Sequence, residues 1–232
     1  AALTSFNVTG SQFRANAANG DADDNFLFEA MGTASMATSV TGSHFASTEG
    51  DHFQAAASVS GTLTVNLVNN TLVGGHSTPL GQGITINAAT GVPGWNGRID
   101  YDINGNNITG AASNGVSVVL GTSSAVAVFD GFVRNNIIGT SGVALSCSTQ
   151  ANGVYIDARG NGTHNSAVTG NTIRQCFDRG LLAEAGDGDS ALNLTVTGNL
   201  IDQQVGAAAR EAFQTNFGIT STNVFGNVDS NV

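Results

Sequence analysis

Apolar residues recur along this chain in a six-residue motif: an apolar residue, any residue, Gly or Asn, Ser or Asn, any residue, and a second apolar residue. Seven copies read VTGSQF, VTGSHF, LVNNTL, INGNNI, FVRNNI, VTGNTI and VTGNLI, and an eighth, VFGNVD from Val224, is cut off by the C-terminus. The seven copies begin at Val8, Val40, Leu67, Ile103, Phe132, Val168 and Val196. A motif that recurs about every 30 residues is typical of a solenoid.

Within each copy, the two apolar residues lie five positions apart and would face opposite sides of a straight strand. Gly and Asn tolerate a left-handed backbone, so the motif predicts a corner that turns both apolar residues inward. Stacked copies form two apolar ladders, the first made of the residues that begin the copies. The second comprises Phe13, Phe45, Leu72, Ile108, Ile137, Ile173 and Ile201. A polar ladder between them comprises Ser11, Ser43, Asn70, Asn106, Asn135, Asn171 and Asn199, whose amides can bond along the stack.

A second segment, upstream of most copies, alternates apolar and other residues and predicts a strand with one buried face. These segments are residues 26–30, 53–57, 84–88, 116–120, 154–158 and 181–185. A third stretch leads directly into the corner, as in AVAVFDGF and ALNLTVTG. Two or three short strands per repeat fit one coil of a parallel β-helix, and a helix is expected only at 205–213.

The VTGNTI-like turns make the chain resemble right-handed parallel β-helix repeat proteins of the pectin-lyase-like superfamily, particularly bacterial surface and secreted members. The resemblance implies an all-β, right-handed, single-stranded parallel β-helix of about eight coils that forms one domain across residues 1–232. It predicts the fold rather than an activity, because that superfamily includes polysaccharide lyases and hydrolases, tailspikes, adhesin passengers and structural stalks. The Arg and Lys sets of its lyases and the GHG and RxK motifs of its hydrolases are not in this sequence.

The charge of the chain limits its partners. Seventeen acidic residues stand against seven Arg, Lys does not occur, and the net charge is −10. Phosphate backbones and anionic membrane surfaces would be repelled, so nucleic acid is not expected as a partner. No apolar run reaches the length of a membrane span.

The two ends of the sequence lack obvious caps, and the start has no signal peptide. We therefore expect a segment or mature part of a longer extracellular or cell-surface protein. Because uncapped solenoid ends expose unpaired strand edges, we expect the ends to be continued, to be capped by another domain, or to join other subunits end to end.

The two cysteines, Cys147 and Cys176, are separated by about one coil but occupy different phases of the repeat. Two interpretations stay open, a disulfide or two separate buried thiols. A disulfide would indicate an oxidising compartment.

The strongest candidate site follows from register. If Val154 stacks on Leu181, then Asp157 and Glu184 occupy equivalent outward positions on adjacent coils. Such a pair suits sugar hydrolysis or a calcium site, with Tyr155 stacking on a sugar ring and Arg159 or Arg179 pairing with an acidic saccharide. Alternatively, both acids are solvated and Arg159 is their counterion.

Other polar groups give weaker signals. The acidic clusters at 21–25 and 187–189 are either calcium ligands or solvated loops, and apart from calcium no cofactor is predicted. Asp100 and Asp102 flank Tyr101 on one strand face, while the four histidines share no pattern. Trp95, in a loop, is a candidate contact for a sugar or a protein.

Two function classes follow from these features. The first is a non-catalytic extracellular structural or adhesive β-helix, such as a stalk, an adhesin passenger or a filament subunit. The second is a carbohydrate-active enzyme or polysaccharide-binding module that acts through the face of Asp157 and Glu184. A groove with aromatic residues and a carboxylate of raised pKa would favour the second class, and a flat polar face the first.

Overall fold

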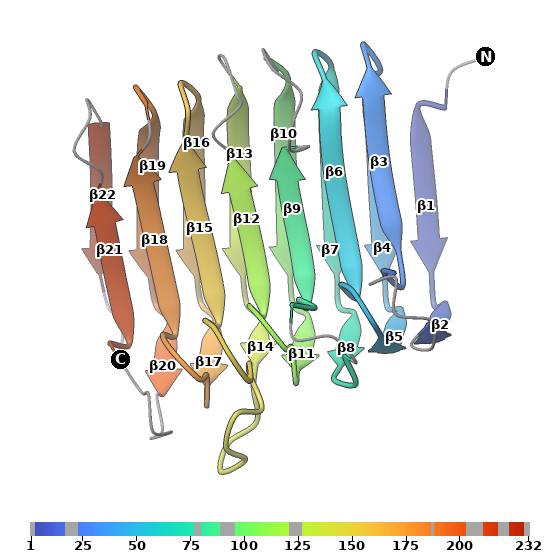
Figure 1. Ribbon diagram of the computed structural model, residues 1–232, viewed down its shortest axis with the longest axis vertical. Coiled ribbons are helices and arrows are strands. Elements are labelled where there is room, and N and C mark those ends of the chain that lie inside the picture. The colour runs from blue at the N-terminus through green and yellow to red at the C-terminus, as the bar shows by residue number, and fades with distance from the viewer. Residues whose placement is uncertain are drawn as a thin grey trace.

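The chain winds into a stack of coils whose strands form three parallel sheets (Figure 1). The structure is a computed structural model that describes residues 3–16, 23–76, 80–88, 96–120, 127–186, 188–202, 211–217 and 223–229. Strands that neighbour each other in a sheet are three apart in chain order, and all their ladders are parallel. This arrangement confirms the predicted all-β parallel β-helix.

The three sheets are named A, B and C here, and each coil contributes one strand to each of them in that order. Sheet A comprises β1 (Ser5–Thr9), β4 (Met36–Thr41), β7 (Thr62–Val68), β10 (Arg98–Asn104), β13 (Val128–Arg134), β16 (Thr163–Thr169), β19 (Ala191–Thr197) and β22 (Asn223–Asp229). Sheet B comprises β2 (Gln12–Asn16), β5 (His44–Thr48), β8 (Thr71–Val73), β11 (Asn107–Thr109), β14 (Ile137–Ile138), β17 (Thr172–Arg174) and β20 (Leu200–Asp202). Sheet C comprises β3 (Leu27–Gly32), β6 (Phe53–Val59), β9 (Ile84–Ala88), β12 (Val116–Leu120), β15 (Val154–Arg159), β18 (Leu181–Gly186) and β21 (Phe213–Phe217). In the described part of the chain, seven sets of three strands precede β22, slightly fewer full coils than the expected eight.

The predicted corner lies between sheets A and B and has the left-handed backbone that the six-residue motif requires. Its central residue has a φ between 55° and 68° in all seven copies. These residues are Gly10, Gly42, Asn69, Gly105, Asn135, Gly170 and Gly198. Gly and Asn are the residues that adopt this conformation at least cost, so the corner residue determines where each copy begins.

The fifth copy begins one residue later than predicted. Ile103 pairs with Val133 rather than Phe132, and Ile108 pairs with Ile138 rather than Ile137. The displaced residues Phe132 and Ile137 point outward and are 47% and 51% exposed. The predicted frame would have required Arg134 at the left-handed corner, whereas the actual frame places Asn135 there.

The eighth copy is also shifted from its predicted position. Val228 pairs with Val196, while Val224, the predicted start, pairs with Leu192. The residue that stacks on Val196 therefore lies four positions later than predicted.

A polar ladder runs along the corner, with one correction. The backbone N–H of each member donates to the side-chain oxygen of the next member at 2.9–3.1 Å. Its members are Ser11, Ser43, Asn70, Asn106, Asn136, Asn171 and Asn199. Asn135 was predicted in this ladder, but it occupies the exposed corner and Asn136 is the buried member. The shifted frame of the fifth copy is the cause.

The sheet C strands bury the alternate residues that the sequence indicates. Phe28 pairs with Ala55, Val116 with Val154, and the inward side chains form part of one core. At the N-terminal end, Phe26 and Phe53 stack with ring centroids 5.2 Å apart. The expected helix at 205–213 lies mostly outside the described residues, and its last residue begins β21 instead. Within the described residues, no helix is long and apolar enough to cross a membrane.

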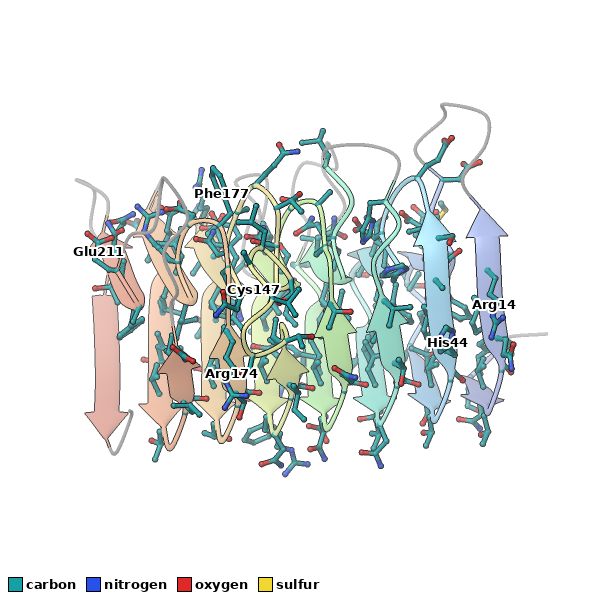
Figure 2. The ribbon with its side chains drawn as sticks, turned by 90° about the horizontal axis from the view of Figure 1, so that it is seen from below. Arg14, His44, Cys147, Arg174, Phe177 and Glu211 are labelled. Atoms are coloured by element: carbon teal, nitrogen blue, oxygen red, sulfur yellow. A yellow bond between two sulfur atoms is a disulfide. The ribbon has the colours of Figure 1, made fainter. Side chains whose placement is uncertain are left out.

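A disulfide joins Cys147 to Cys176, which decides between the two interpretations of these cysteines. Cys147 lies in the segment between β14 and β15, which extends beyond the stack in Figure 1. The two Cα atoms are 4.7 Å apart and both side chains are buried, and Figure 2 labels Cys147 within this segment. The bridge therefore anchors the projecting segment to the next coil.

Candidate functional site

Register brings the predicted carboxylate pair together on the outer face of sheet C. Val154 pairs with Leu181, and Asp157 on β15 consequently pairs with Glu184 on β18. Strand alternation places Tyr155 and Arg159 on the same face as Asp157. All four predicted side chains therefore form one cluster.

Hydrogen bonds and ion pairs connect every member of this cluster. Arg159 Nε lies 3.0 Å from Asp157 Oδ1 and 2.9 Å from Asp157 Oδ2, and Arg159 Nη2 lies 3.2 Å from Glu184 Oε2. The Tyr155 hydroxyl donates to Glu184 Oε2 at 2.7 Å. The other oxygen, Glu184 Oε1, accepts from Asn216 Nδ2 of β21 at 2.8 Å. Asn216 was not predicted as a member of this cluster. The long, irregular sequence between β20 and β21 hides how β21 is in register with β18.

The two carboxylates differ in electrostatics. Burial raises the pKa of Asp157 to about 6, although the adjacent Arg159 acts in the opposite direction. Burial also acts to raise the pKa of Glu184. Hydrogen bonds from Asn216 and Tyr155, together with the charge of Arg159, outweigh that effect, and the pKa of Glu184 lies below its usual value.

Asp157, the carboxylate with the raised pKa, is shielded from the solvent. Asp157 is only 3% exposed, and both its oxygens face Arg159. A general acid or base must come within hydrogen-bond reach of its substrate. Arg179, the other predicted partner of an acidic saccharide, contacts Asp178 and Gln214 instead.

A second polar group lies on sheet A, where an open hollow of about 330 Å³ crosses β7, β10 and β13. Arg98 bridges two carboxylates, with Nε 2.6 Å from Asp100 Oδ1 and Nη2 2.9 Å from Asp130 Oδ2. Arg134 binds Asp102 through two bonds of 2.8 and 2.7 Å. Asp100 and Asp102 lie on one strand face, as the sequence indicated.

Phe132 lies on the same strand as Asp130 and lines the hollow beside Arg134. The Arg134 guanidinium carbon is 5.4 Å from the centroid of the Phe132 ring, which suits a cation–π contact. The predicted frame of the fifth copy placed this ring in the core, so its position in the hollow was not predicted. The signal that identifies its true position is the poor fit of Arg134 at the corner.

The core beneath the hollow contains a buried hydrogen-bonded group. The Tyr101 hydroxyl lies 3.0 Å from His164 Nε2 and 2.8 Å from Ser166 Oγ, across the intervening strand β13. Gly131 on β13 leaves space for the Tyr101 ring, since a Cβ there would lie 2.6 Å from Tyr101 Cγ. His164 Nδ1 lies 3.1 Å from the carbonyl oxygen of Asp157, which can only accept, so Nδ1 carries the hydrogen.

A third polar group lies near the start of β6. Burial raises the pKa of Asp51 to about 7 and lowers that of His52 to about 3. The rings of His52 and His76 are 4.4 Å apart, although the sequence showed no shared pattern among the histidines. Asp51 Oδ1 accepts from the backbone N–H of Gln82 at 2.7 Å. The arrangement links adjacent coils.

The remaining predicted candidates give no assembled site. Asp21 and Asp187 of the acidic clusters, and Trp95, lie outside the described residues. Among the residues that the structure describes, no group of three or more His, Cys, Asp or Glu side chains could hold a metal ion.

Comparisons with protein-family models, curated proteins and solved structures found no match to this chain. The fold therefore defines the class of protein, a parallel β-solenoid.

Proposed function

We propose that this chain is a non-catalytic extracellular β-helix with a structural or adhesive role, as a surface stalk, an adhesin passenger or a filament subunit. One observation carries the proposal: the carboxylates of the candidate catalytic pair are bound within the protein. Asp157 is buried against Arg159, and both oxygens of Glu184 accept from neighbouring side chains. A pair held in this way joins three successive coils through β15, β18 and β21 rather than facing a substrate.

The covalent and polar links between coils support the structural role. The Asn ladder bonds each coil to the next along the corner, and the disulfide joins Cys147 to Cys176. Stable disulfides are typical of extracellular proteins and rare in reducing compartments. The same features suit a rod that provides length and presents its faces to partners, including other subunits.

Negative-stain electron microscopy with size-exclusion chromatography tests the proposal, together with surface labelling of the source cells. Filaments, end-to-end chains or surface-attached rods support it. Confinement of the protein to a reducing cytoplasm would contradict it. In parallel, purified protein is incubated with a panel of polysaccharides and the release of reducing ends is measured.

A second candidate function is a carbohydrate-active enzyme. The observation that favours it is the divergence of two paired carboxylates, with the pKa of Asp157 raised to about 6 and that of Glu184 lowered. Paired groups with separated pKa values suit acid and base roles. Activity on any polysaccharide that disappears in both Asp157→Asn and Glu184→Gln would establish the enzyme and overturn the non-catalytic proposal.

A further inference from the structure

We propose that the hollow on sheet A is a binding site for a neutral saccharide. The site consists of Arg98, Asp100, Asp102, Asp130, Phe132 and Arg134 on β10 and β13. It lies on a different sheet from the carboxylate pair of sheet C. The inference deepens the proposed function, because it rests on the adhesive role and names the chemistry that the rod would adhere to.

The carboxylates of the hollow are held in place but retain acceptor capacity. Arg98 engages Oδ1 of Asp100 and Oδ2 of Asp130, and among the described residues no donor reaches the other oxygen of either carboxylate. Both side chains are partly exposed, at 36% and 43%. Each carboxylate can therefore accept a hydrogen bond from a hydroxyl group without losing its arginine. Two fixed acceptors at the same level of adjacent strands suit a pair of sugar hydroxyls.

An exposed aromatic ring provides the apolar part of the site. Phe132 is 47% exposed, and its partners across the sheet are Asp102 on β10 and Ala167 on β16. Ala167 is a small neighbour, and the Arg134 guanidinium lies over the ring at 5.4 Å from its centroid. A sugar presents an apolar face of C–H groups that packs on an aromatic ring while its hydroxyls reach polar neighbours. A single exposed ring among charged groups therefore suits a polyhydroxylated ring.

The charges of the hollow favour a neutral occupant over an ion. Three carboxylates stand against two guanidinium groups, and the whole chain carries a net charge of −10, so an anionic saccharide would be repelled. A cation would be repelled by the guanidinium groups of Arg98 and Arg134, which lie within hydrogen-bond distance of the same carboxylates. A neutral saccharide accepts and donates hydrogen bonds without either cost.

The size and rigidity of the hollow also suit a small part of a glycan. Its volume of about 330 Å³ lies at the lower end of the range of roughly 300–1,000 Å³ for small-ligand sites. The strand that carries Asp100 and Asp102 is anchored from below by Tyr101, which bonds to His164 and Ser166. Groups held in their binding geometry lose less conformational entropy when a ligand binds.

The test uses the whole chain and a set of immobilised hexasaccharides. Neutral probes are cello-, xylo-, manno-, malto- and chitohexaose, and acidic probes are oligogalacturonate and oligoalginate. We expect retention of at least one neutral probe and of neither acidic probe. Calorimetry with the retained probe should show that Phe132→Ala and Asp130→Asn each weaken binding by about tenfold or more. Asp130→Asn leaves Arg98 paired with Asp100.

Two matched variants control for exposed surface and charge. Ile137→Ala removes an apolar side chain that is 51% exposed on sheet B, and Glu29→Gln removes an exposed charge on sheet C. Both should bind the probe as the unmodified chain does, and thermal melts should show that all four variants are folded. Absence of binding to every neutral probe, preference for an acidic probe, or equal weakening by the controls would overturn the saccharide site. Surface-attached rods without glycan binding would still leave the proposed structural role intact.

Discussion

Replacing Asn136 with Ala should destabilise the fold far more than replacing its neighbour Asn135 with Gly. The Asn136 side chain is 1% exposed and makes four hydrogen bonds. Its Oδ1 accepts from the backbone N–H and the Nδ2 of Asn106, and its Nδ2 donates to Ile103 O and Asn171 Oδ1. In the Ala variant, the buried N–H of Asn106 loses its acceptor.

The expected magnitude follows from these bonds. A buried N–H without a partner costs about 1–3 kcal/mol, and each of the three other bonds contributes about 0.5–1.5 kcal/mol. We therefore expect Asn136→Ala to lower the free energy of unfolding by at least about 2.5 kcal/mol. Asn135 has a φ of 55°, and its side chain donates one exposed hydrogen bond, from Nδ2 to Asn104 Oδ1. Gly occupies the same corner in five other copies, so Asn135→Gly should change the free energy of unfolding by less than about 1 kcal/mol.

Urea denaturation of both variants, followed by far-UV circular dichroism without reductant, measures the two values. The comparison is direct because the two residues are adjacent and both substitutions remove an amide. A loss for Asn135→Gly equal to or greater than that for Asn136→Ala would refute the register of the fifth copy and the ladder derived from it.

Three further predictions concern other parts of the stack. Replacing Cys147 and Cys176 with Ser should lower the free energy of unfolding by about 3–4 kcal/mol, because the bridge spans 29 residues; an unchanged urea midpoint would contradict this. Asp51 keeps its proton in the folded chain up to a pKa of about 7 but loses it near pH 4 when unfolded, so it costs stability as pH rises between these values. Asp51→Asn should therefore gain roughly 2–3 kcal/mol more over the unmodified chain at pH 8 than at pH 5 in urea titrations, and a pH-independent difference would refute the shift. Gly131→Ala should lower the melting temperature and cost at least about 2 kcal/mol, since its Cβ would lie 2.2 Å from the Tyr101 carbonyl oxygen; a normal melt would show that Tyr101 can move.

The sequence alone was enough to predict the parallel β-helix, because the fold repeats a local rule. A left-handed corner accepts Gly or Asn at little cost, and the residues beside it must be apolar to face the core. The alternation upstream predicted the sheet C register, including the pairing of Asp157 with Glu184. Applied strictly, the same rule also locates the fifth copy, since Arg134 is a poor corner residue and Asn135 a good one.

Only the tertiary structure decided which polar groups meet. The sequence placed Asp157 and Glu184 side by side, but their pKa values depend on Arg159 and on Asn216 from the next coil. It likewise left the cysteines undecided, because the projecting segment between β14 and β15 changes their phase. The hollow on sheet A depends on a shift of one residue, which moves Phe132 from the core to the surface because side chains alternate along a strand. Local periodicity thus determines the coil, whereas contacts between coils depend on segments of irregular length whose ends only the folded stack brings into register.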